Sequence, residues 1–200
     1  MKVPAKTTAW RVTMASSSLL SFFVLYPFVH ECGHLIPAIA GGATVNDFVW
    51  TPFFGHAHVG LSNVSGSALP WVDAGGALLP TLVGTALVGT WMALPTKASG
   101  PNWRLWLLVP GVVMLVGNLG LFFEATVGSG SYRHMYLLAK AIGGEGIVGK
   151  ALEVLPAVWT VVVVALAIGL HRRQSKATEP SGERANWKWS GNERGKFPPE

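Results

Sequence analysis

Four long apolar stretches constrain what this chain can fold into. They run over residues 12–39, 66–94, 103–125 and 151–170, and each holds at least 20 residues. A helix rising 1.5 Å per residue needs about 20 residues to cross a hydrocarbon layer roughly 30 Å thick. We therefore predict an all-α integral membrane protein, with four transmembrane helices in one polytopic membrane domain over residues 1–171.

The composition agrees with this fold class. Hydrophobic residues make up 50% of the chain and charged residues 12%, with a mean hydropathy of +0.40. The formal net charge is +5, but the basic residues gather at the ends of the apolar stretches, which is typical of membrane anchoring and not of nucleic-acid binding. Residues 172–200 are polar and basic, and we expect a disordered tail there.

The segment between the first two apolar stretches has a different character. Gly41 and Gly42 end the first helix, and residues 43–65 mix aromatic and β-branched residues with turn formers, which predicts a short β-hairpin or an extended loop. His56 and His58 would share one strand face and contact a metal ion or a substrate. A hydrated loop explains the same pair, and both interpretations stay open.

The first apolar stretch carries an H-E-x-x-H motif. His30 and His34 lie one helical turn apart, so both imidazoles can reach one zinc ion, and Glu31 beside them can take a proton from a metal-bound water. Ionisable residues inside a membrane span cost roughly 2.5 to 3.5 kcal/mol each, which favours a functional role. Buried polar residues paired with their neighbours are the alternative. Cys32, the only cysteine, excludes an intramolecular disulfide and points away from the predicted metal face.

A secretory signal is a further alternative for the same stretch. Lys2, Lys6 and Arg11 precede an apolar run over residues 19–29, and residues 38–40 resemble a small-residue cleavage site. Cleavage there would remove the motif. A cluster of two histidines and a glutamate is unusual in such a region.

Topology gathers the polar residues on one side. In alternating spans the end of the first helix, the start of the second and the end of the third face the same leaflet. The residues placed there are His30, Glu31, His34, Asp73, Asn118 and Glu124, with the loops of His56, His58 and His134. Three Lys and Arg residues precede the first helix, and seven follow the last helix. The first, second and third loops between the helices contain none, two and three of them. The positive-inside rule then predicts that both termini are cytoplasmic. We expect the chain to lie in a bacterial cytoplasmic membrane.

A catalytic zinc usually takes three protein ligands, so the two histidines need a partner. Glu124 is the first choice, because a carboxylate near the end of an apolar helix needs a partner and an ion provides one. Asp73 and His134 are reserves, and Asp73 is also suited to orient a ligand imidazole by a hydrogen bond. Asn118 joins His56 and His58 as a candidate substrate contact.

The run His30-Glu31-Cys32-Gly33-His34-Leu35, followed by Ala40-Gly41-Gly42, resembles the first core helix of the site-2 protease family of intramembrane zinc metalloproteases. Residues 73–80 and Asn118-Leu119 resemble the family's later core helices less specifically. The resemblance implies a Zn²⁺ cofactor, a catalytic Glu31 and a short sheet element after the first core helix. The family's third ligand is typically an Asp following the Asn, whereas this chain has no Asp after Asp73.

The leading hypothesis is a zinc metalloendopeptidase that hydrolyses membrane-protein or peptide substrates within the lipid bilayer. A catalytically inactive relative that acts as a membrane scaffold or assembly factor is the alternative. A metal-binding transporter component is a third interpretation, which the absence of a repeated half disfavours. No nucleic-acid partner is expected, and the sequence does not indicate an oligomeric state.

Overall fold

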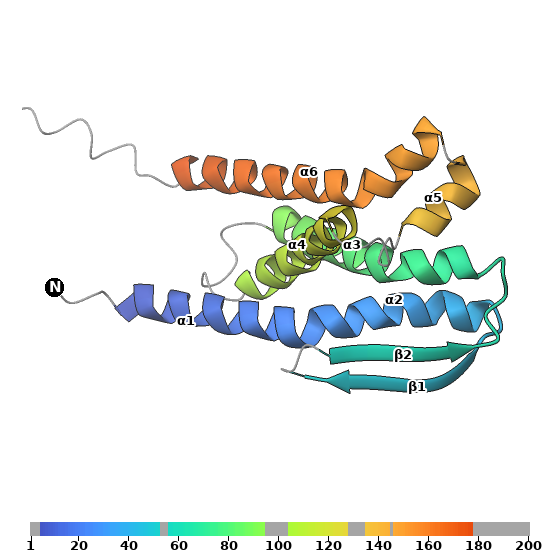
Figure 1. Cartoon of the computed structure of the whole chain (residues 1–200). Helices are drawn as coiled ribbons and strands as arrows, with labels where there is room; N and C mark the ends of the chain where they lie inside the picture. The colour runs from blue at the N-terminus through green and yellow to red at the C-terminus, as the bar shows by residue number, and fades with distance from the viewer. Residues whose placement is uncertain (1–4, 53–55, 95–103, 128–134, 145, 178–200) are drawn as a thin grey trace, which may run out of the picture.

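The computed structural model describes residues 5–52, 56–94, 104–127, 135–144 and 146–177. These residues form a helical bundle with one small two-stranded sheet (Figure 1). The helices are α1 (Ala5–Leu20), the π-helix η1 (Ser21–Leu25), α2 (Tyr26–Ala40), α3 (Leu69–Ala93), α4 (Leu105–Val127), α5 (Tyr136–Gly143) and α6 (Ile147–Ala177). The strands are β1 (Thr44–Thr51) and β2 (His56–Ser62).

The first apolar stretch folds into one long rod, in which α1, η1 and α2 follow each other without a loop (Figure 1). The π-helix ends at Leu25, two residues before Pro27, whose missing N–H removes one i to i−4 hydrogen bond of an α-helix. Helix α2 then continues through Pro37 and ends at Gly41.

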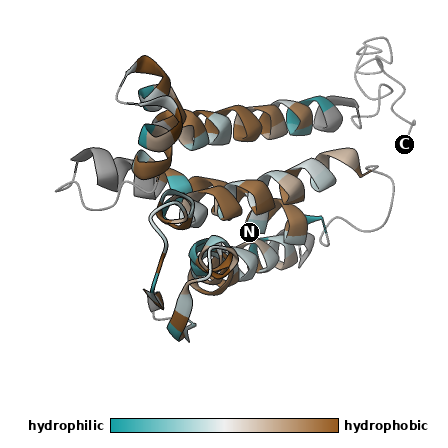
Figure 2. Ribbon diagram, turned by 90° about the vertical axis from the view of Figure 1, so that its right-hand side faces the viewer, coloured by the Kyte–Doolittle hydropathy of each residue, from teal (hydrophilic) through white to brown (hydrophobic). Residues whose placement is uncertain are grey.

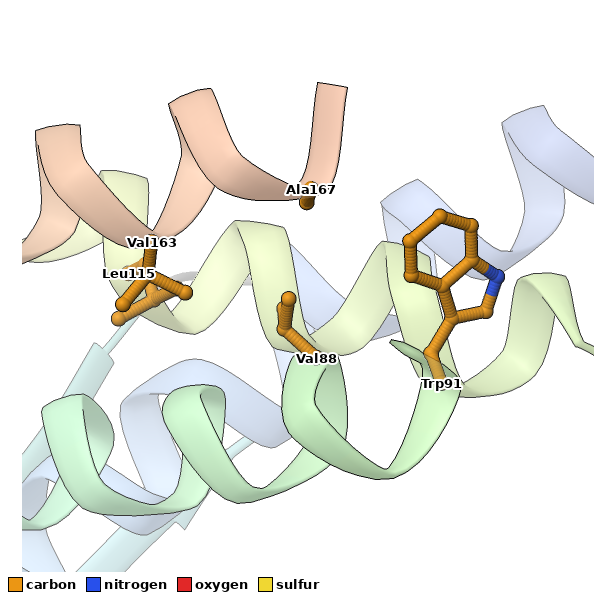
Figure 3. Close-up of a cluster of buried hydrophobic side chains, with 5 residues drawn as sticks. All are labelled: Val88, Trp91, Leu115, Val163 and Ala167. Atoms are coloured by element: carbon orange, nitrogen blue, oxygen red, sulfur yellow. The ribbon is translucent and has the colours of Figure 1, made fainter. Parts of the chain in front are cut away.

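Helix α3 runs antiparallel to both α2 and α4. Gly33 of α2 meets the backbone of Gly75, and Gly84 lies against Gly111 of α4, so α3 approaches each neighbour at a glycine. Close approach through small residues is the usual basis of helix packing in membranes. Farther along α3, Val88, Trp91, Leu115, Val163 and Ala167 form a buried apolar cluster that joins α3, α4 and α6 (Figure 3).

The predicted hairpin is present. Strands β1 and β2 pair antiparallel, from Thr44 opposite Ser62 to Thr51 opposite His56, with an irregularity between Val45 and Asp47. The hairpin lies along the α2 part of the rod (Figure 1), where Phe28 packs against Phe48 at 6.0 Å and Trp50 at 5.1 Å between ring centroids.

Helices α5 and α6 close the described part of the chain. Met135 and Leu138, at the start of α5, pack on Ala74 and Ala77 of α3. Helix α6 continues to Ala177, seven residues beyond the predicted end at Leu170, because no proline or glycine interrupts the polar run until Pro180. The remainder of the predicted disordered tail, residues 178–200, lies outside the described residues.

Three of the described helical segments are long and apolar enough to cross a membrane: Thr8–Ala40, Leu69–Ala93 and Val154–Arg173. The apolar run of α4 that can be assessed, Leu105–Leu119, is shorter. Apolar residues predominate along the helices (Figure 2), as expected of membrane-spanning segments. The membrane fold class is thus supported by three spans, and the fourth span stays a prediction.

Candidate metal centre

The two histidines of the motif face each other on α2. The Nε2 atoms of His30 and His34 lie 3.2 Å apart, and the ring centroids 4.9 Å apart. Two nitrogens bound to one tetrahedral zinc at 2.0 to 2.1 Å lie about 3.3 Å apart. The pair therefore has the spacing that one ion needs, although an N–H···N hydrogen bond between the rings has a similar length.

A backbone carbonyl orients one of the two rings. Nδ1 of His34 donates a hydrogen bond to the carbonyl oxygen of Val72, on α3, at 2.6 Å. Because a carbonyl only accepts, the proton of a neutral His34 lies on Nδ1, and the lone pair of Nε2 is directed toward His30. A hydrogen bond of this kind commonly fixes the tautomer of a metal-binding histidine.

Helix α3 has a glycine, Gly76, at the position that faces the two imidazoles, and the missing side chain leaves space for the rings. A Cβ atom added at Gly76 would lie 2.6 Å from Cε1 of His34 and 2.8 Å from Cε1 of His30. The neighbouring pair Gly33 and Gly75 brings the two backbones into contact, so the rings are held against α3. The spacing of the two nitrogens fits a shared zinc ion with His30 and His34 as two of its ligands.

Glu31 lies on the flank of α2, between two packed faces. Successive residues of an α-helix are rotated by about 100°, so Glu31 lies between His30, which faces α3, and Phe28, which faces the hairpin. Its side chain is half-buried and makes no hydrogen bond or ion pair with another described residue.

Asp73 is the described acidic residue that α3 brings toward the histidines. It follows Val72, precedes Gly76 by one turn, is half-buried, and interacts electrostatically with His34. This position suits the orienting role considered for Asp73 in the sequence. Among the described residues, however, no group of three or more His, Cys, Asp or Glu side chains is placed to hold a metal ion.

The side chains of two other ligand candidates lie outside the described residues. Glu124 belongs to α4, but only its backbone is described, and His134 falls in the undescribed segment before Met135. The choice of third ligand therefore stays a prediction.

Asn118, a predicted substrate contact, is buried between helices. Its amide nitrogen donates to the carbonyl oxygen of Ala77 at 2.9 Å and to Oγ1 of Thr81 at 2.7 Å. Its Oδ1 lies 3.4 Å from the hydroxyl of Tyr26. These contacts join α4 to α3 and α2, and the substrate role stays a prediction.

The two hairpin histidines lie away from the motif histidines. Position 56 pairs with Thr51 and position 58 with Val49 on a hairpin that packs against the Phe28 face of α2. His58 is exposed, and its Nε2 lies 3.9 Å from Oδ1 of Asp47. The side chain of His56 lies outside the described residues, and the role of this pair in contacting a metal ion or a substrate stays a prediction.

Two residues around the site were missed in the sequence. Tyr26 packs its ring 5.9 Å from that of His30 and was not singled out, although it precedes His30 by one helical turn. Gly76 was not singled out as part of the site, although it makes room for the imidazoles. Comparisons with protein-family models, with curated proteins and with solved structures find no match to this chain.

Proposed function

We propose that this protein is an intramembrane zinc metallopeptidase. The observation that carries the proposal is the pair of Nε2 atoms of His30 and His34, 3.2 Å apart over Gly76, at the contact of two helices long enough to span a membrane. Zinc at such a site supplies a Lewis acid that makes a water molecule acidic enough to attack a peptide carbonyl near neutral pH.

Glu31 acts as the general base in this proposal. It adjoins His30, is half-buried on the flank of α2, and makes no hydrogen bond or ion pair with another described residue. A carboxylate so placed accepts the proton of the attacking water and returns it to the leaving amine. Val72 meanwhile holds the His34 ring through its carbonyl.

Glu124 completes the ligand set in this proposal, and helix register supports it. Helix α4 runs in the same direction as α2, and Asn118 lies level with Tyr26. Measured along the helix axes from the level of Asn118 and Tyr26, position 124 lies about 9 Å farther along α4, and His30 and His34 lie about 6 and 12 Å farther along α2. Position 124 therefore lies between the levels of the two histidines. Seven residues separate positions 117 and 124, so position 124 falls on the face of α4 that Gly117 turns to Tyr26.

The substrate is a membrane segment that unwinds before cleavage, because a helical backbone hides its carbonyls. Strand β1 is exposed along its length and lies beside α2, so an extended segment can pair with an edge of the hairpin on the Glu31 flank. With both termini cytoplasmic, as the basic residues predict, the metal centre opens on the opposite side of the membrane.

The test is to measure zinc in the protein purified in detergent, by mass spectrometry of the metal. Wild type is expected to hold zinc, and His30→Ala and His34→Ala to lose it. His171→Ala is the matched control, because His171 is exposed at the far end of α6, near Trp91. A wild-type protein without zinc would overturn the enzyme proposal.

Hydrolysis and the third ligand are tested next. Glu31→Gln is expected to keep zinc but to lose cleavage of a dye-labelled casein and of membrane-spanning peptides. If Glu31→Gln keeps all cellular function, the scaffold alternative replaces the peptidase. Zinc content of Glu124→Ala, Asp73→Ala and His134→Ala then assigns the third ligand, and a loss confined to His134→Ala would move it from Glu124.

A further inference from the structure

A line of polar side chains runs along the rod formed by α1, η1 and α2, on the face that packs against the neighbouring helices. Ser17, Ser21, Tyr26, His30 and His34 succeed one another at intervals of four, five, four and four residues. The five-residue interval coincides with the π turn, in which the backbone N–H of Tyr26 bonds to the carbonyl of Ser21. A π turn aligns residues five apart as an α-helix aligns residues four apart, so the line keeps to one face.

The first two members of the line pack against α4. Ser17 is 0% and Ser21 1% exposed, at the contact of α1 and η1 with α4. Without the extra residue of the π turn, the face that carries Ser17 and Ser21 would be rotated about the helix axis by about 100° from the face that carries the histidines. The π turn therefore allows one helix to pack on α4 and present its histidines to α3.

Tyr26 is the point at which α4 reaches the histidines. A Cβ atom added at Gly117 would lie within 2.6 Å of Cζ of the tyrosine ring, so α4 lies directly against it. The same ring lies 5.9 Å from the imidazole of His30, tilted by 35°. Its hydroxyl donates to Asn118, whose own amide is held by Ala77 and Thr81.

We propose that Tyr26 is a positioning residue for the metal centre, through which α4 fixes the ring of His30. The proposal rests on the proposed function in that it gives His30 a metal-binding role. The ring of Tyr26 fills the space between Gly117 and His30, so a shift of α4 is transmitted to the imidazole. The contact of the ring carries this role, and the long hydrogen bond to Asn118 contributes less.

The experiment measures zinc affinity and the absorption spectrum of the Co²⁺-substituted protein. Gly117→Ala pushes the tyrosine ring toward His30 and is expected to weaken zinc binding about tenfold or more, the range reported for groups that support metal ligands. Gly89→Ala is the matched control, because a Cβ atom there meets nothing within 4 Å, and it is expected to change nothing. Tyr26→Ala is expected to weaken binding, and Tyr26→Phe to restore it.

The double variant Gly117→Ala with Tyr26→Ala separates positioning from general packing. Without the ring, the alanine at position 117 has nothing to push, so the double variant is expected to bind zinc as Tyr26→Ala does. Independent losses that add, or a Gly117→Ala protein that binds zinc like Gly89→Ala, would overturn the proposal. If Tyr26→Ala does not fold, the comparison of Gly117→Ala with Gly89→Ala decides.

The imidazole ¹³C and ¹⁵N resonances of His30 give a second measurement that does not depend on zinc. Gly117→Ala is expected to shift them and Gly89→Ala to leave them unchanged. A wild-type protein that lacks zinc but shows this pattern would overturn the proposed function while preserving the contact. Unchanged resonances in a zinc-binding protein would overturn the role of Tyr26 alone.

Discussion

The two halves of helix α3 are packed in different ways. Its first half meets α2 through backbone, where Gly75 touches Gly33 and Gly76 lies under the imidazoles of His30 and His34. Beyond the approach of Gly84 to Gly111 of α4, its second half meets α4 and α6 through side chains, in the cluster of Val88, Trp91, Leu115, Val163 and Ala167 (Figure 3). Both halves belong to one apolar span.

The difference lies in what fills the space between the helices. In the second half large apolar side chains interlock, so removing atoms leaves a cavity. In the first half, glycines leave room for the imidazole rings of His30 and His34, so a larger residue in place of a glycine would displace these rings. We therefore expect the site to be sensitive to enlargement and the core to truncation.

Gly33→Val is expected to have the largest effect. The valine Cβ would occupy the place of the Gly75 carbonyl, and backbone cannot move aside as a flexible side chain can. We expect α2 and α3 to separate, with a loss of stability of about 3 kcal/mol or more. Thermal unfolding in detergent measures the loss. Gly89→Val, in open space on α3, serves as the control, and equal melting of the two variants would refute the close contact.

Leu115→Ala tests the other half. Leu115 is 0% exposed in the apolar cluster, and its truncation is expected to cost about 2 to 5 kcal/mol of stability while leaving zinc affinity unchanged. Val116→Ala, at an exposed position of the same helix, should cost within about 0.5 kcal/mol. A loss of zinc affinity in folded Leu115→Ala would show that the two halves are not independent.

Gly76→Ala is expected to act on the metal centre. The added methyl group would displace both imidazoles, and we expect zinc affinity to fall by roughly 10- to 100-fold, the range for changes next to metal ligands. Gly89→Ala provides the same substitution in the same helix, where it meets no neighbour. Zinc titration followed by competition with a chelator measures both. Equal affinities would mean that the metal, if bound, lies elsewhere.

The sequence predicted the elements of this fold better than their contacts. Apolar length indicated the helices, and the mixture of turn formers and β-branched residues indicated the hairpin, because both signals are local. The π turn was not predicted, since it depends on how Ser17 and Ser21 are buried against neighbouring helices. Helix α6 ran past its predicted end because apolarity marks the membrane span and not the end of the helix.

The same limit holds at the candidate site. The spacing of His30 and His34 predicted a shared face, and their rings do face each other. The roles of Val72 and Gly76 were not predictable, because they depend on the register of α3 against α2. This register places the carbonyl of Val72 next to His34 and the side-chain-free Gly76 next to both imidazoles. Asn118 was predicted as a substrate contact from its polarity and its expected place on the same side of the membrane as the motif, whereas its burial against Thr81 appears only when α3 and α4 are packed.

Trp159→Phe is expected to have the smallest effect, and it tests how far the side-chain packing of the second half extends. Nε1 of Trp159, on α6, donates to Oγ1 of Thr85 of α3 at 2.9 Å, at an exposed position beside the apolar cluster. Hydrogen bonds between membrane helices contribute about 0.6 kcal/mol on average, because the separated helices find other partners. We expect a loss of that size in thermal unfolding and unchanged zinc affinity. Trp71→Phe, at an exposed residue with no hydrogen bond from its side chain to another described residue, should leave stability unchanged. A loss above about 2 kcal/mol for Trp159→Phe would mean that this bond, and not the apolar cluster, holds α6 on α3.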